Sequence, residues 1–296
     1  MKNPFFYRIS QFVGFLLGAR VFVALLLTFA LYVSIFFLFN REESLRNFVF
    51  DFKVHAIVFC TILSILAGGI INQFYDREKD QLTKPFRTRV QKFFKQKYFL
   101  YAYLTLNLIS LGIAVLISPR VFFYFLVYQF LMWFYSHKLS KMLIINNLTF
   151  VSLTVYPFFG MWVYYKTFSE KIFLMAIFLF VILVMIDIIK DLLTKNADKV
   201  FNYNTIPIVL GSKATRVILS FLSVVLIGIS MLIIHEDGIH NMMNLYFSLG
   251  LFIIIFALYL LLNPIKKANF FAINILRVWV FVGIFAMFFD GIVKRF

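Results

Sequence analysis

Long apolar runs alternate with short polar segments along the whole chain. Nine runs are rich in Phe, Leu, Ile and Val, at 17–39, 54–72, 98–117, 120–136, 143–164, 171–190, 216–235, 243–263 and 269–292. Crossing the hydrocarbon layer takes roughly 20 apolar residues as helix, because backbone groups there must bond within their own segment. The pattern therefore predicts nine transmembrane helices, with the third and fourth runs forming a tight hairpin.

The composition is that of a membrane protein, and the net charge raises the question whether the protein binds nucleic acid. Hydrophobic residues make up 62% of the 296-residue chain and charged residues 14%, and the mean hydropathy is +0.91. The net charge of +16 could indicate nucleic acid. The basic residues lie in short segments between apolar runs, however, where membrane topology accounts for them. We therefore expect a lipid bilayer as a partner and no nucleic acid.

The basic residues also predict the orientation of the chain. If the N-terminus is inside, the inner segments hold 19 of the 29 Lys and Arg residues and the outer segments hold eight. Cytoplasmic loops carry such an excess. We expect a protein of the plasma (inner) membrane whose N-terminus and active site face the cytoplasm.

Two acidic stretches fall on this inner side, at the ends of the second and sixth runs. They read "NQFYDREKDQLTKPFR" at 72–87 and "DIIKDLLTKNADK" at 187–199. Because the two helices lie four spans apart, the fold is predicted as an all-α bundle of two four-helix pseudo-repeats plus a ninth helix. No linker divides residues 1–296, so a single domain is expected.

The first stretch has the spacing of a cation site. Asn72, Asp76 and Asp80 are four residues apart, so they line one face of a continuing helix. Magnesium prefers oxygen ligands and is usually held by one or two carboxylates together with substrate phosphates. Lys84 and Arg87 follow, and they are expected to contact the remaining phosphate oxygens.

The second stretch supplies a matching group of carboxylates. Asp187 and Asp191 are four residues apart, and Asp198 lies two turns further on. If both acidic faces converge on one diphosphate, bound Mg²⁺ would take up the charge that forms as diphosphate leaves an allylic carbon. The sequence therefore predicts a prenyl diphosphate as substrate and a small-molecule acceptor.

These stretches resemble the two aspartate motifs of the UbiA superfamily of intramembrane prenyltransferases. "YSHK" at 135–138 is similar to the Tyr-Ser feature after that family's fourth helix, and "NTIPIVLG" at 204–211 is similar to the tail of its second motif. The resemblance implies a helical bundle around a central cavity that is open to the bilayer. One position departs from the family pattern: Thr194 stands where the second motif commonly has Asp, so that the second metal is held more weakly or Asp187 compensates.

The resemblance also implies roles for individual residues. Asn72, Asp76 and Asp80 would hold one magnesium, and Asp191 and Asp198 would hold the second, with Asp187 as the further metal ligand that could compensate for Thr194. The residues expected to contact substrate are Lys84, Arg87, Lys138, Lys190 and, near the cavity mouth, Arg20. Tyr135 would lie beside the reacting carbon.

The predicted function is magnesium-dependent transfer of a polyprenyl group from its diphosphate to a quinone precursor, another aromatic acceptor or a glyceryl-phosphate ether lipid. The tails "TKPFR" and "NTIPIVLG" look more like the ether-lipid and chlorophyll-type branches of the family than the hydroxybenzoate branch. The alternative is a membrane transporter or scaffold that kept the fold. A CDP-alcohol transferase is disfavoured, because "DGIH" and "DGIV" lack its DGxxAR signature.

Overall fold

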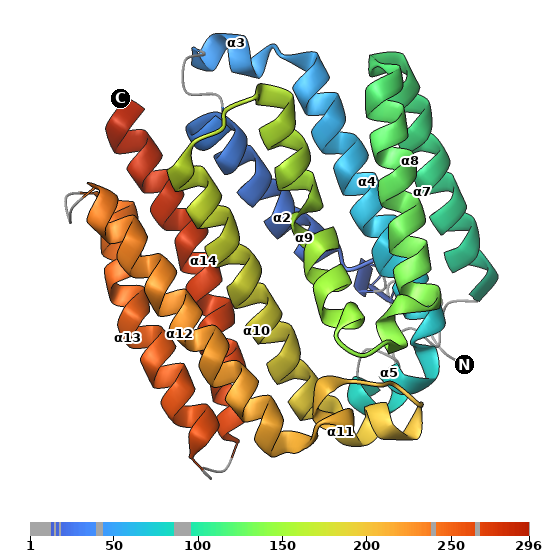
Figure 1. The fold of residues 1–296 in the computed structure, drawn as a ribbon. Helices are drawn as coiled ribbons and strands as arrows, with labels where there is room; N and C mark the ends of the chain where they lie inside the picture. The colour runs from blue at the N-terminus through green and yellow to red at the C-terminus, as the bar shows by residue number, and fades with distance from the viewer. Residues whose placement is uncertain are drawn as a thin grey trace, which may run out of the picture. The chain divides into compact units, whose positions relative to one another are not determined.

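The computed structural model describes residues 13–14, 16–17, 19–39, 44–85, 96–237, 241–263 and 267–295. All regular elements in these ranges are helices, as predicted (Figure 1). The chain divides into two compact units, the first formed by Met1–Leu31 and Glu43–Ser140 and the second by Tyr32–Glu42 and Lys141–Phe296. The main division falls between the fourth and fifth apolar runs, where the two predicted halves meet.

The first unit is built around α4, which packs against α7 and α8. Its helices are α2 (Val21–Ser34, whose last turn belongs to the second unit), α3 (Leu45–Val49), α4 (Phe52–Tyr75), α5 (Arg77–Thr83), α7 (Gln96–Ile117) and α8 (Pro119–His137). A buried polar chain joins the three central helices: Gln129 donates to Ser64 at 3.1 Å, and the hydroxyls of Ser64 and Ser110 lie 3.2 Å apart. These contacts satisfy polar groups that lipid cannot.

The second unit packs α10 against α9, α12 and α14, and α13 against α12 and α14. Its helices are α9 (Ile145–Tyr165), α10 (Glu170–Val200), α11 (Ile206–Val209), α12 (Gly211–Asp237), α13 (Met242–Leu262) and α14 (Ala268–Arg295), and the short π-helix η1 (Ile35–Phe39) packs on α9 and α14. A 3-10 turn, η2 (Leu139–Lys141), precedes α9. Tyr246 of α13 stacks on Trp279 of α14 at 4.7 Å, which fixes the spacing of these two helices.

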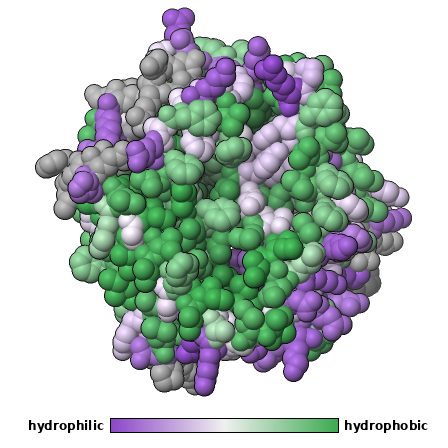
Figure 2. Space-filling model, in the orientation of Figure 1, coloured by the Kyte–Doolittle hydropathy of each residue, from purple (hydrophilic) through white to green (hydrophobic). Residues whose placement is uncertain are grey.

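Each of the nine predicted runs coincides with a long helical segment in the described residues. Seven of these segments are long and apolar enough to cross a membrane, which makes the chain an integral membrane protein. The helices α8 and α9 are not among the seven, because Arg, Gln, His and Tyr side chains dilute the apolar content of α8, and Asn, Ser, Thr and Tyr side chains that of α9. The exact count of nine spans therefore stays a prediction. Hydrophobic residues cover most of the surface visible in Figure 2, as expected for contact with lipid.

The sixth run is longer than predicted. The sequence indicated an end at residue 190, but α10 continues to Val200 and has 31 residues. At 1.5 Å per residue the helix is about 46 Å long, well beyond the roughly 30 Å of a hydrocarbon core. The charged residues after 190 are thus helical, and the whole second acidic stretch belongs to one rigid element.

Candidate active site

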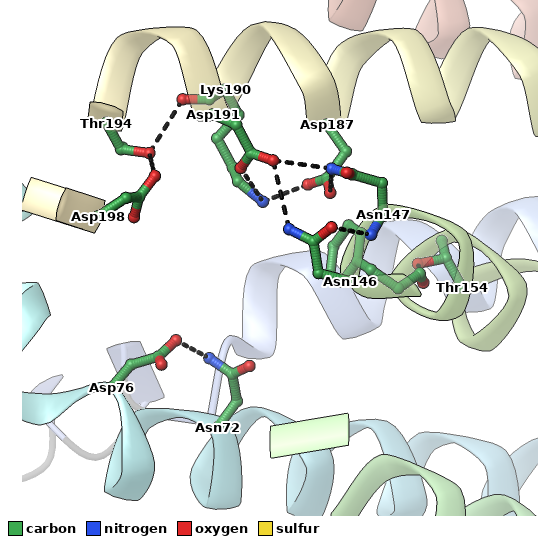
Figure 3. A network of polar contacts seen from close by, with 11 residues as sticks. Asn72, Asp76, Asn146, Asn147, Thr154, Asp187, Lys190, Asp191, Thr194 and Asp198 are labelled. Atoms are coloured by element: carbon green, nitrogen blue, oxygen red, sulfur yellow. Dashed lines mark hydrogen bonds and ion pairs between the residues drawn. The ribbon is translucent and has the colours of Figure 1, made fainter. Parts of the chain in front are cut away.

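The first aspartate set lies at the junction of α4 and α5, in the first unit. Asp76 interrupts the helix between Tyr75 and Arg77, yet its backbone N–H still donates to Asn72 and its carbonyl still accepts from Asp80. The predicted single face is therefore kept. The Asn72 amide donates to Asp76 Oδ2 at 2.9 Å (Figure 3). Asp80 is buried, whereas Asn72 and Asp76 are half-buried.

Basic residues accompany this first set. Lys84 donates to Asp80 Oδ1 at 2.7 Å, one turn along the helix, so in this structure it neutralises a carboxylate. Arg20 lies just before α2 and packs on α4 at Gly69, one turn before Asn72. Its Nε is buried without a hydrogen-bond partner among the described residues. Arg87 falls outside the described residues.

The Tyr-Ser motif lies at the end of α8, in the same unit. Tyr135 is half-buried there, and Lys138 caps the helix with an exposed side chain. His137 between them is packed by aromatic rings, stacking on Trp133 at 5.3 Å and meeting Tyr75 edge-on at 5.4 Å. The proposed roles of Tyr135 and Lys138 toward substrate stay predictions.

The second aspartate set lies on one face of α10, in the second unit (Figure 3). Asp187, Asp191 and Asp198 are buried, with 3%, 2% and 0% of their surface exposed. Ionised carboxylates at such depth need hydrogen bonds and positive charge close by. The contacts around each of them therefore indicate what the site is built to hold.

Two asparagines outside the predicted set of site residues supply most of these contacts. Asn147, at the start of α9, donates through Nδ2 to Asp187 Oδ2 at 2.8 Å and to Asp191 Oδ2 at 2.9 Å. Asn146 donates to Asp191 at 3.4 Å and accepts the backbone N–H of Asn147 at 2.7 Å. The sequence offered one signal for them. Two adjacent asparagines stand near the start of the apolar run 143–164, on the side of the membrane predicted for the acidic stretches.

A strained turn precedes these asparagines. Ile144 has φ 63° and ψ −44°, and the N–H of Ile145 donates to the carbonyl of Leu143 at 2.6 Å, so the three residues form a γ-turn. A β-branched residue seldom adopts positive φ, and such strain costs on the order of 1–3 kcal/mol. Asn146 and Asn147 come directly after this turn, and their side chains contact the aspartates of α10.

Positive charge reaches the second set from two helices. Lys190 forms ion pairs with Asp187 Oδ1 and, at 3.8 Å, with Asp191 Oδ1. Its ammonium also lies 5.1 Å from the centre of the Phe150 ring. Arg277 of α14 is close enough to Asp187 to interact electrostatically. The predicted substrate contact Lys190 is thus a partner of the aspartates in this structure.

Thr194 is a hydrogen-bond partner of Asp198. Its hydroxyl donates to Asp198 Oδ2 at 2.7 Å and lies 3.2 Å from the carbonyl of Lys190. The residue that replaces the motif's usual aspartate therefore orients the next carboxylate along the helix.

The donor set suits a hard divalent cation that is shared with phosphate. No group of three or more His, Cys, Asp or Glu side chains in the described part of the chain is arranged to hold a metal alone. The first set nevertheless offers buried Asp80 with half-buried Asp76 and Asn72, and the second set offers three buried carboxylates beside two buried asparagines. The Oδ1 of Asn147 is a buried oxygen without a hydrogen-bond partner in the described residues. Magnesium commonly takes one or two carboxylates plus substrate oxygens, which these residues fit.

Sequence comparison identifies the class of protein. The model of the UbiA prenyltransferase family matches residues 44–281, most of the chain. The chain belongs to this family, as the motifs indicated. Membership favours a prenyl-transferring enzyme over the transporter or scaffold alternative.

The more particular relatives are named for one reaction. A digeranylgeranylglyceryl phosphate synthase of Thermococcus gammatolerans is 27% identical over 79% of this chain and 84% of its own length. The enzyme of the same name from Thermococcus sibiricus is 28% identical over 82% and 86%.

Solved structures show the same fold. A structure of a digeranylgeranylglyceryl phosphate synthase has a TM-score of 0.72 at 19% identity, covering 96% of this chain and 99% of the other. A UbiA homologue from Archaeoglobus fulgidus, bound to GPP and Mg²⁺, has a TM-score of 0.64 at 14% identity, with 93% and 99% coverage.

Proposed function

We propose that this protein transfers a prenyl group from a prenyl diphosphate to a glyceryl-phosphate lipid and releases diphosphate. The observation that carries the proposal is the buried carboxylate pair Asp187–Asp191 on α10, which also bears Asp198. Asn147 of α9 donates a hydrogen bond to each carboxylate of the pair. Buried acidic side chains on one helix face serve no packing purpose, whereas they suit a cation that binds a phosphate leaving group.

The acceptor is assigned from the relatives. Their name describes a product with two geranylgeranyl groups on glyceryl phosphate, so the acceptor it implies carries one. The tails "TKPFR" and "NTIPIVLG" agree with that branch of the family. Geranylgeranyl diphosphate is the matching donor.

The described residues account for the steps that the chain itself performs. The carboxylates of each aspartate set would hold a divalent cation, proposed to be Mg²⁺, which supplies positive charge to the departing diphosphate. Lys84, Lys190 and Arg20 would contact phosphate oxygens, and the apolar helices would keep water from the prenyl cation. Three points stay predictions. Both aspartate sets act on one diphosphate, they belong to a single domain, and the site faces the cytoplasmic side of the plasma (inner) membrane.

The test is a reaction with purified protein in lipid nanodiscs. Geranylgeranyl diphosphate and geranylgeranylglyceryl phosphate are supplied with Mg²⁺, and released diphosphate and the lipid product are measured. Asp76→Asn and Asp191→Asn should each lower the rate at least about a hundredfold, as loss of a group that stabilises a leaving group does. Asp290→Asn is the matched control, because Asp290 lies outside both aspartate sets and forms its ion pair with Lys294, one turn away on α14, at 2.7 Å.

Two results would overturn the proposal. One is the absence of diphosphate release with this pair of substrates when the protein is folded. The other is faster turnover with 4-hydroxybenzoate as acceptor, which would assign the protein to an aromatic branch. Removal of divalent cations by EDTA should stop the reaction, and re-addition of Mg²⁺, Mn²⁺ or Cd²⁺ in turn identifies the cation that supports it.

A further inference from the structure

Two side chains, Lys190 and Asn147, each contact both Asp187 and Asp191. Lys190 approaches the Oδ1 atom of each aspartate, and Asn147 donates to the Oδ2 atom of each. All four oxygens are therefore engaged before any cation or substrate arrives. A carboxylate oxygen can accept a hydrogen bond and ligate a cation at the same time, so Asn147 can stay in place. A divalent cation beside the two Oδ1 atoms, in contrast, would be repelled by the Lys190 ammonium that already lies there.

The two partners differ in how readily they can leave. Asn147 is 1% exposed and is fixed at the start of α9 by its neighbours. The Lys190 side chain is 39% exposed and lies on a flexible four-carbon stem. Lysine is also the partner that resembles the incoming ligand, because its ammonium is a compact positive charge beside two acceptor oxygens.

We propose that the Lys190 ammonium occupies the cation position of the second aspartate set, and that a divalent cation binds there tightly only when diphosphate draws the lysine away. The inference rests on the proposed function, because it assigns an order of loading to the same site. Diphosphate oxygens are strong acceptors for an ammonium group. Arrival of the diphosphate thus gives Lys190 a new partner at the moment when the cation takes over its old ones.

The described residues provide a reason for such an arrangement. Asp187 and Asp191 lie one turn apart and are almost fully buried, so their charges repel each other unless a positive charge lies beside them. Lys190 supplies that charge while the site holds no substrate. A parallel exists in the first set, where Lys84 pairs with buried Asp80 at 2.7 Å.

The experiment measures binding of Mn²⁺ by electron paramagnetic resonance, with and without inorganic pyrophosphate. Asp76→Asn is introduced into every protein, so that the signal reports the second set. Without pyrophosphate, Lys190→Met should bind Mn²⁺ about tenfold more tightly or better than the parent, since one competing charge is removed. With pyrophosphate the parent should gain affinity, and the difference between the two proteins should shrink.

Two control variants separate competition from a general change of charge. Lys195→Met removes the same charge from the same helix, but Lys195 contacts the hydroxyl of Ser212 at 3.0 Å and not the carboxylate pair. It should bind Mn²⁺ like the parent. Lys190→Arg keeps a cation in place and should also show no gain. Thermal unfolding verifies that each variant is folded, and Lys190→Gln replaces Lys190→Met if the latter is not.

The proposal is overturned if the uncharged Lys190 variant binds Mn²⁺ no more tightly than the parent in the absence of pyrophosphate. It is equally overturned if Lys195→Met gives the same gain. Because no prenyl substrate is used, the measurement remains interpretable even if the protein fails to release diphosphate from geranylgeranyl diphosphate, so the two proposals fail separately.

Discussion

Replacement of Asn147 by leucine tests how the second aspartate set is held together. The substitution keeps the number and branching of the side-chain heavy atoms and removes the Nδ2 donor that bonds Asp187 at 2.8 Å and Asp191 at 2.9 Å. Hydrogen bonds to charged groups contribute about 1.5–3 kcal/mol in soluble proteins, whereas interhelical bonds in membranes average about 0.6 kcal/mol and reach about 1.7. Two charge-assisted bonds near the upper membrane value predict a loss of about 2–4 kcal/mol.

The assay is unfolding of the purified protein by SDS in mixed micelles, which yields a free energy of unfolding. Asn146→Leu is the matched control. Its side chain donates one longer bond to Asp191, at 3.4 Å, and accepts one bond from a neutral group, the backbone N–H of Asn147. Because only the longer bond involves a charged partner, the loss should be smaller. A double-mutant cycle of Asn147→Leu with Asp187→Leu then isolates the pairwise term, expected at about 1–2 kcal/mol. Equal losses for both asparagine variants, or a coupling energy near zero, would refute the assigned network.

Three further substitutions test other features by the same unfolding assay. Ile144→Gly should stabilise the protein by about 1 kcal/mol because glycine tolerates positive φ. Its control, Ile145→Gly inside α9, should destabilise the protein, and no gain for Ile144→Gly would contradict a strained turn. Gly69→Ala should lower the free energy of unfolding by about 1–3 kcal/mol, because the new Cβ would lie 2.9 Å from the backbone oxygen of Ala19. Its control, Gly112→Ala, places a Cβ with no atom within 4 Å and should be neutral or stabilising. Thr194→Val should cost about 1–3 kcal/mol by removing the donor to buried Asp198, and Thr194→Ser should retain stability.

The sequence by itself determined the class of fold and the positions of the acidic side chains. Apolar runs long enough to span a bilayer can form only helices there, so hydropathy predicted a helical segment at each of nine places. Spacing by four residues is likewise a local property. It put Asn72, Asp76 and Asp80 on one helix face without reference to any other part of the chain.

Only the tertiary structure decided which partners those side chains have. Asn147 meets Asp187 and Asp191 across 40 and 44 residues of sequence, and nothing in either segment specifies that approach. It depends on how α9 packs on α10 and on the turn at Ile144. Hydropathy missed the true end of α10 for a related reason. The apolar run stops at residue 190, whereas the contacts of buried Asp191 and Asp198 with Asn146, Asn147 and Thr194 offset the cost of keeping the later residues helical. Periodicity fixes the face of a helix, and packing alone fixes what that face meets.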